Sequence, residues 1–517
     1  MLKETDRFGM SPLMHAAMQG DEDAVRLLLD HPSADAAAMM MHTDENGSNA
    51  LMKAAEAGDV DVMRLLLEHP SADAAAMMMH TASDGATALM HVARDGHVDA
   101  MRLLLDHPSA DTAAMMMIKD AAGCTAFMRA VKYGHLDAIC LLLHHPSADP
   151  QVKMMHTTTT DGQNILMLAA QSGNVAAMRL LLDHLSADAA TMMMQTDTSG
   201  AIALMWAAMR NHVGAGAMRL LLDHLYAEPA AMMMITNAAG FTALMRAVQF
   251  GNLDAMRIML NHPSANAATM LMQANTRGST ALMLAVQHER IGAMRLLLDH
   301  PCADPAAMMM HINAVGSSAL MQAADMSNVA AMRLLLYHPS ADPAAMMTHA
   351  NSHGDTALIA AAHHGFVDAM RLLLDHPSAD AAAMIEGRSL SGDSALTVAA
   401  RFTAGLSFSK TWRPLLLLLR RVAMEPQPCN DQRAHMTNVL EILFQGRSSK
   451  ALFDNDHLDD VRDECIRLLL ELGARCATCA DTPAVSRIIR EALQLARVPQ
   501  HLNEAVVGAA IARQQPS

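Results

Sequence analysis

The sequence has 517 residues and a formal net charge of −16, and 50 of its residues are methionine while only 3% are aromatic. The acidic balance argues against general nucleic-acid binding, for which a basic face is expected. The longest aliphatic run extends only from Leu415 to Leu419, far short of the ~20 residues that a membrane-spanning helix requires. These features favour neither nucleic acid nor membrane as a partner.

The cysteine pattern and the N-terminus bear on localisation. The seven cysteines are scattered and odd in number, which favours free thiols in a reducing compartment over a disulfide framework. The first residues lack the apolar region of a signal peptide. We therefore expect a cytoplasmic protein, monomeric and without a cofactor or metal.

A glycine recurs along most of the chain at a nearly constant spacing. Nine of the ten intervals are 38 or 39 residues and the other is 40, the positions being Gly9, Gly47, Gly85, Gly123, Gly162, Gly200, Gly240, Gly278, Gly316, Gly354 and Gly392. A fixed period of this size predicts a solenoid built from stacked repeats. We number the repeats from one, at Gly9, to eleven, at Gly392.

Each repeat predicts two helices. A Ser, Thr or Asn stands before the first helix in ten of eleven repeats, where its side-chain oxygen can cap the helix. The exception is Ile202, so the first helix of repeat six should start poorly. A second glycine ends that helix in the left-handed conformation, and Glu289 and Ser327 should fit this position less well.

The second helix should bury Met101, Leu104 and Leu105, which fall at i, i+3 and i+4. Its recurring arginines have two interpretations, a basic ladder for an anion or a solvated face of paired charges. We favour the paired charges. The histidines that recur at its C-terminal end suggest a metal site or a pH sensor. However, histidines of neighbouring repeats are too far apart to share one metal ion, and the helix dipole itself favours a histidine at a helix C-terminus.

The repeat resembles the ankyrin repeat, and the resemblance covers about residues 6–400. The matching positions in repeat three are Gly85, Thr87, Leu89, Ala93, Gly96, His97, Val98, Leu104 and Leu105. Alanine usually replaces the family's proline, and methionine replaces its histidine. The resemblance implies an all-α, ankyrin-type α-solenoid of helix-turn-helix repeats with short hairpin loops, and a non-enzymatic scaffold that binds a protein partner.

Each repeat is about five residues longer than the ~33-residue ankyrin unit. The excess is a stretch rich in alanine and methionine that follows an acidic residue, as at 36–41. Both residue types favour helix, so we predict one or two added helical turns. The methionines have two interpretations, an adaptable surface for a partner helix or packing between added turns. Their regular recurrence favours packing.

The positions that vary most among the repeats are candidates for partner contact, because the resemblance implies that they line the concave face. Aromatic and basic residues gather there in repeats three to seven, and Trp, Tyr and Arg are enriched at interface hot spots. Such a groove in an acidic chain suggests an acidic partner segment, although Trp206 and Phe250 have an alternative role as core fillers. The candidates are Arg94, Arg129, Lys132, Tyr133, Trp206, Arg210, Phe241, Arg246 and Phe250.

The regular spacing fails near residue 400. We expect a regular array over residues 1–400, degenerate ankyrin-like repeats with loops over 401–475, and a C-terminal helical cap over 476–517. An alternative function is a ubiquitin-ligase substrate adaptor that acts through the C-terminal helices. A lone Cys476-x-x-Cys479 is weak evidence for zinc, and no nucleophile–base set or phosphate loop stands out.

Overall fold

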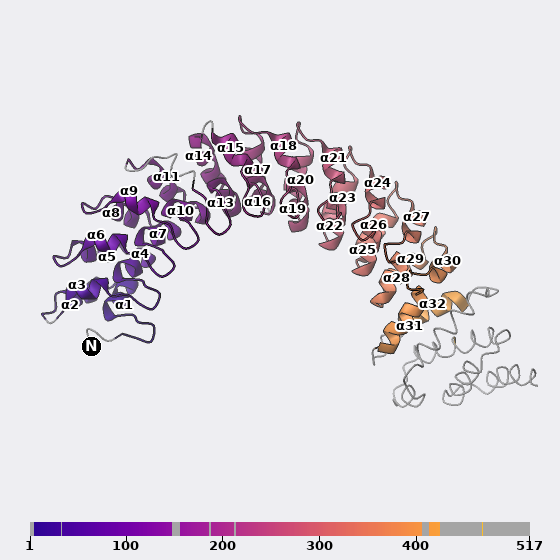
Figure 1. Cartoon of the computed structure of the whole chain (residues 1–517), viewed down its shortest axis with the longest axis horizontal. Coiled ribbons are helices and arrows are strands. Elements are labelled where there is room, and N and C mark those ends of the chain that lie inside the picture. Colours follow the sequence, from indigo (N-terminus) through magenta and orange to yellow (C-terminus); the bar gives the residue numbers. More distant parts are fainter. Residues whose placement is uncertain are drawn as a thin grey trace, which may run out of the picture. The chain divides into compact units, whose positions relative to one another are not determined.

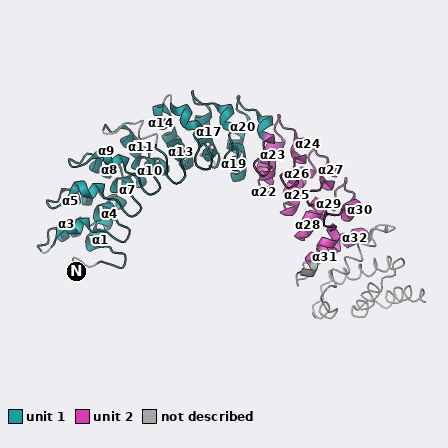
Figure 2. Cartoon of the chain, viewed as in Figure 1, with its two compact units in different colours: residues 1–270 teal, residues 271–517 magenta. Residues whose placement is uncertain are grey.

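The computed structural model describes residues 5–32, 34–146, 156–185, 188–210, 214–405 and 413–423, together with Leu468. The expected helical cap at 476–517, the Cys476-x-x-Cys479 pair and most of the degenerate repeats lie outside these residues. The described chain divides into two compact units, Met1–Met270 and Leu271–Ser517 (Figure 2).

Helices of three kinds alternate along both units (Figure 1). The first helices of the repeats are α1 (Pro12–Gln19), α4 (Ala50–Ala57), α7 (Ala88–Asp95), α10 (Ala126–Tyr133), α13 (Ile165–Ser172), α16 (Ala203–Ala208), α19 (Ala243–Phe250), α22 (Ala281–Gln287), α25 (Ala319–Asp325), α28 (Ala357–His363) and α31 (Ala395–Gly405). The second helices are α2 (Glu22–Leu29), α5 (Val60–Glu68), α8 (Val98–Leu105), α11 (Leu136–His144), α14 (Val175–Leu185), α17 (Gly214–Leu222), α20 (Leu253–Leu260), α23 (Ile291–Leu298), α26 (Val329–Leu336), α29 (Val367–Leu374) and α32 (Arg413–Ala423). Short helices follow at α3 (Ala36–Met41), α6 (Ala74–Met79), α9 (Thr112–Met117), α15 (Ala189–Met194), α18 (Pro229–Met234), α21 (Ala267–Met272), α24 (Pro305–Met310), α27 (Pro343–Thr348) and α30 (Ala381–Glu386).

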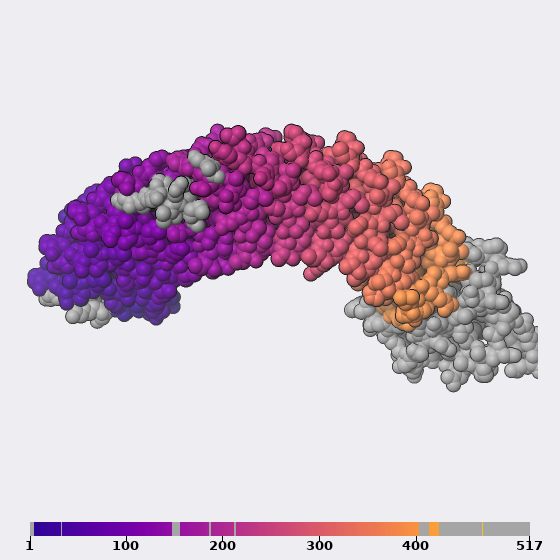
Figure 3. Space-filling model, turned by 45° about the horizontal axis from the view of Figure 1, so that its top comes forward, coloured from indigo at the N-terminus to yellow at the C-terminus, as the bar shows by residue number. Residues whose placement is uncertain are grey.

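Within each unit, a first helix packs on the first helix of the next repeat, and second helices pack on one another in the same way. The hairpins between repeats are short, and in the described part of unit 2 they form isolated β-bridges such as Ala274–Thr280. The all-α solenoid of helix-turn-helix repeats with short hairpin loops is therefore confirmed. In unit 2, the loops between second and short helices lie along one edge (Figure 1), where the surface rises in separate protrusions (Figure 3).

The first helices begin at the predicted caps. The Ser11 hydroxyl accepts the N–H of Met14 at 3.3 Å, and Asn49 accepts the N–H of Met52 at 2.9 Å. Ile202 makes no such bond, as expected, and α16 has only 6 residues against the 8 of α19. Thr280 occupies the same position without a side-chain cap bond, which the sequence did not predict.

The inner glycine takes the left-handed conformation that the sequence predicts. Gly58, for example, has φ of 72°. Glu289 and Ser327 stand at the same position with φ of 55°, a conformation that is strained for residues with a side chain. In the second helix, Met101, Leu104 and Leu105 are buried as predicted.

The alanine- and methionine-rich stretches form the added helical turns. In α3, Asp35 accepts the N–H of Ala38 at 3.2 Å, and Met39 and Met40 are buried while Met41 is 37% exposed. The same pattern recurs in α6, whose Met77 and Met78 are buried. Packing between repeats thus accounts for most of these methionines. The corresponding stretch of repeat four lies within 147–155, outside the described residues.

Several recurring polar residues of the second helices have local partners. Arg64 pairs with Asp61 at 2.9 Å and Arg257 with Asp254 at 3.0 Å, and Arg26 lies 3.7 Å from Glu22, so paired charges form in repeats one, two and seven. The C-terminal histidines shape the turn that follows, since Nδ1 of His107 accepts the N–H of Ser109 at 3.2 Å. The same bond forms at His69, His224, His262, His300, His338 and His376.

Candidate functional site

The candidate site is the face formed by the first helices and the hairpins that precede them. In most repeats the hairpin is organised by a polar side chain that folds back on its own backbone. In repeat two, Asp44 Oδ1 accepts the N–H groups of Asn46 at 2.9 Å and Ser48 at 2.8 Å. Nine residues later lies Lys53, the fourth residue of α4, and we call this place in each first helix the variable position. In repeat two the hairpin residue and the variable residue are in direct contact.

Where the hairpin residue is aspartate, its second oxygen holds the variable side chain. The distances to Oδ2 are 3.0 Å from His15 Nε2 to Asp6, 2.9 Å from Lys53 Nζ to Asp44, 2.8 Å from Arg129 Nε to Asp120 and 3.0 Å from Trp206 Nε1 to Asp197. In each pair Oδ1 serves the hairpin backbone. Arg129 and Trp206, two of the predicted contact residues, are thus anchored within their own repeats.

Four of the nine candidates lie on the adjacent helices α7 and α10. Arg94 forms a bidentate pair with Asp95, with Nη2 at 2.7 Å from Oδ2, and this hydrogen bonding raises the pKa of Arg94. Arg129 pairs with the buried Asp120 and also lies 3.7 Å from Asp84. Lys132 and Tyr133 are exposed, Tyr133 by 53%. Carboxylates of the chain itself therefore neutralise two of the three cations in this group.

The other five candidates lie on the adjacent helices α16 and α19, in the turn after α16 and in the hairpin before α19. The N–H of Ala238 donates to the carbonyl of Ser199 at 2.8 Å, which joins the two hairpins. At the C-terminal ends of α16 and α19, Asn252 Nδ2 donates to the carbonyl of Arg210 at 2.8 Å. Trp206 is half-buried, while Arg210 and Phe250 are exposed. Helix α13 lies between the two groups, so the structure gathers the candidates in two places (Figure 1).

Arg246 differs from the other arginines of this face. Its guanidinium lies over the ring of Phe241, with Cζ 4.7 Å from the ring centroid, and Nη1 donates to Gln249 Oε1 at 3.0 Å. Within the described residues, no carboxylate lies at ion-pairing distance from it, since the hairpin residue of repeat seven is Asn237. Burial lowers the pKa of Arg246, and the charge of Asp197 opposes that shift in part. The side chain remains a half-buried cation.

His91 occupies the same variable position in repeat three, outside the group of aromatic and basic candidates. The hairpin residue there is Ala82, so no aspartate holds the imidazole. His91 is 6% exposed, and its Nδ1 lies 3.3 Å from Glu56 Oε1 of the preceding repeat. Burial lowers the pKa of His91, and the negative charge of Glu56 opposes that shift. A variable-position histidine without the hairpin aspartate is the sequence feature that distinguishes His91 from His15.

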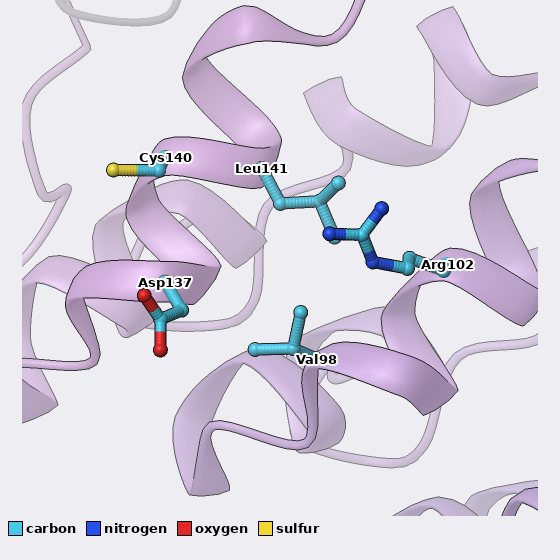
Figure 4. Close-up of a pocket in the computed structure, with 5 residues that line it drawn as sticks. All are labelled: Val98, Arg102, Asp137, Cys140 and Leu141. Carbon is cyan, nitrogen blue, oxygen red and sulfur yellow. The ribbon is translucent and has the colours of Figure 1, made fainter.

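A depression of about 440 Å³ lies elsewhere, on the second helices α8 and α11 (Figure 4). Val98, Arg102, Asp137, Cys140 and Leu141 line it, and the Arg102 and Leu141 side chains reach toward one another. Cys140 stands where most repeats have the recurring arginine. None of the predicted contact residues lines this depression. Across the part of the chain that the structure covers, no cluster of three or more His, Cys, Asp or Glu residues is arranged to hold a metal ion.

Among the described helices, none is both long enough and apolar enough to cross a membrane.

Comparison with curated proteins gave no match. A family model described as "Ankyrin repeats (3 copies)" matches residues 2–78, 72–154, 152–229, 189–269 and 264–347, and the single "Ankyrin repeat" model matches residues 353–384. These matches extend over well more than half of the sequence and agree with the stacked helical repeats. The chain belongs to the ankyrin repeat family.

Proposed function

We propose that this protein is a non-enzymatic scaffold that binds a segment of a partner protein along the groove lined by its first helices and hairpins. Ankyrin repeats are protein-interaction modules. The observation that carries the proposal is a contrast in exposure: the recurring Leu and Met of the first helices, such as Leu89 and Met90, are buried. Tyr133, Arg210 and Phe250 at variable positions are exposed. Large aromatic and arginine side chains of this kind dominate protein interfaces.

The partner segment is acidic in this proposal. The chain as a whole carries a charge of −16, yet Lys132, Arg210 and Arg246 present positive charge on this one face. Complementary charge attracts an acidic segment to the groove and excludes a basic one. We further propose that the protein acts as a monomer in the cytoplasm, where its free cysteines would remain reduced.

Capture of a partner tests the proposal. The protein is used as bait in a lysate, beside the double variant Trp206→Ala/Arg246→Ala, and proximity labelling identifies what is bound. The double variant should lose the captured protein while its helicity, measured by circular dichroism, stays unchanged. A surface control is Arg64→Ala on the paired-charge face. Equal capture by the double variant and the parent protein would contradict binding at this face.

The second candidate, a ubiquitin-ligase adaptor acting through the expected cap at 476–517, concerns residues outside those described. Recovery of ligase subunits by the full chain, and their loss on removal of residues 476–517, would support it. Retention of the captured partner by the same truncated protein would separate scaffold from adaptor.

A further inference from the structure

Four repeats show how a donor on the first helix binds a carboxylate. In repeats one, two, four and six, the hairpin aspartate uses Oδ1 for the backbone and Oδ2 for the donor on the first helix, at 2.8–3.0 Å. Donors as different as imidazole, ammonium, guanidinium and indole satisfy the same oxygen. The position on the first helix is therefore a place where a donor meets one carboxylate.

Repeat seven has the donor without the carboxylate. Asn237 Oδ1 accepts the N–H groups of Ala239 at 3.1 Å and Phe241 at 2.9 Å, so the hairpin is built as in the aspartate repeats. The remaining atom of the side chain must then be the amide nitrogen, which is a donor and cannot pair with a guanidinium. The contacts that hold Arg246 within the described chain come instead from Phe241 and Gln249.

Other repeats with asparagine at this hairpin position do not share the feature. Asn275, Asn313 and Asn351 precede Leu284, Gln322 and Ala360, none of which is a cation. In the described chain, repeat seven thus combines a cation at the variable position with a hairpin residue that cannot neutralise it. Neighbouring apolar surface comes from Trp206, from Phe241 and from Phe250, which is 37% exposed.

We propose that Arg246 binds one aspartate or glutamate carboxylate of the partner segment, which takes the place that the hairpin aspartate fills in repeats one, two, four and six. This inference rests on the proposed function and names its central contact. The guanidinium offers two parallel N–H donors to a carboxylate. Phe241 holds the guanidinium plane from one side by a cation–π contact. Residues flanking the bound carboxylate lie against Trp206 and Phe250, so an apolar side chain beside the acidic one is part of the recognised sequence.

The decisive variant is Asn237→Asp, because it retains Arg246 and supplies the missing carboxylate from within. The probe is a fluorescein-labelled peptide of alternating Glu and Leu, compared with its Gln and Leu counterpart by fluorescence anisotropy. Asn237→Asp and Arg246→Gln should each weaken binding of the Glu peptide by about tenfold or more, as expected for loss of a hydrogen-bonded charge pair. The double variant Asn237→Asp/Arg246→Gln should bind no more weakly than Arg246→Gln. Asn275→Asp is the matched control, with Leu284 at the variable position, and should bind like the parent protein.

Three results would overturn the inference: no preference of the parent protein for the Glu peptide over the Gln peptide, no binding of the Glu peptide, or full-strength binding by Asn237→Asp. None of these decides whether the protein is a scaffold, because capture of a cellular partner is measured separately. A partner captured through Trp206 and Arg246 without carboxylate preference would end this inference alone, whereas failure to capture any partner would end the proposed function.

Discussion

Arg129 in repeat four and Arg246 in repeat seven occupy the same position on helices α10 and α19, yet their surroundings differ. Arg129 lies against the buried Asp120, whose side chain is 5% exposed, and near Asp84. Arg246 lies on Phe241 and beside Gln249. The hairpin residue nine positions earlier sets the difference, since Asp120 offers a second carboxylate oxygen and Asn237 offers an amide nitrogen. One cation is neutralised within its own repeat, and the other is the one that we propose binds the partner.

The largest expected effect on stability comes from replacing the hairpin residue of repeat four, compared with the same change in repeat seven. Asp120→Ala leaves the largely buried Arg129 without its close carboxylate and should cost about 3–5 kcal/mol of local stability. Asn237→Ala removes only neutral hydrogen bonds to the hairpin backbone and should cost about 1–2 kcal/mol. Hydrogen exchange of the α10 and α19 amides measures both opening free energies. Equal losses would show that the two arginines are held alike.

A second comparison concerns the end of the first helix. A Cβ added at Gly58 would lie 2.5 Å from Nδ1 of His97, and its φ of +72° is unfavourable for any side chain. Gly58→Ala should therefore destabilise repeat two by about 1–2 kcal/mol or more. Glu289→Gly, at the same position in repeat eight, should instead stabilise its repeat by up to about 1 kcal/mol. Exchange of the α4 and α22 amides should move in opposite directions, and a shift of the same sign in both would refute the assignment.

The missing cap of repeat six gives a smaller effect. Ile202→Thr supplies the side-chain oxygen that Thr242 provides to Met245 at 3.2 Å in repeat seven. The gain should be about 1 kcal/mol at α16, in line with other cap residues. Ile202 is fully buried, so Ile202→Val serves as the packing control. A stabilisation by valine as large as that by threonine would point to packing instead of capping.

The smallest effect depends on pH and compares the parent protein with the variant His91→Gln. Because burial lowers the pKa of His91 in the folded protein, the unfolded chain binds its proton more readily. Stability from this residue is thus complete above the ordinary histidine pKa of about 6.5 and declines as the pH falls through it toward the lower folded value. The variant should lose this part of the acid sensitivity of repeat three. Identical pH profiles for α7 exchange in both proteins would contradict the assignment.

The repeat architecture could be predicted from the sequence because its determinants are local and recur. Caps such as Asn49, left-handed glycines such as Gly58 and the Leu104 stripe each act within a few residues of the chain. Repetition then separates these signals from chance. The added turns at α3 and α6 were predictable for the same reason, since an aspartate before alanine and methionine favours helix wherever it occurs.

The availability of each candidate side chain could not be predicted from its own position. Arg129 and Arg246 look equivalent in the sequence, and only the contact across the hairpin distinguishes them. The sequence leaves Trp206 with two possible roles, partner contact in the groove or filling of the core. In the structure its indole N–H instead donates a hydrogen bond to Asp197, nine residues earlier. Like Arg246, His91 has no carboxylate at that hairpin position, because Ala82 stands nine positions earlier. The identity of the residue nine positions before each candidate distinguishes Arg129 and Trp206, which follow aspartates, from Arg246, which follows an asparagine.

The most direct test follows both arginines in one protein. Side-chain Nε–Hε spectra of arginine-labelled protein, assigned with Arg129→Gln and Arg246→Gln, are recorded as the Glu and Leu peptide is added. We expect the Arg246 signal to shift and saturate while the Arg129 signal stays in place. A shift of Arg129 with Arg246 unchanged, or no shift of either signal, would contradict the claim that the hairpin residue decides which cation a partner can reach.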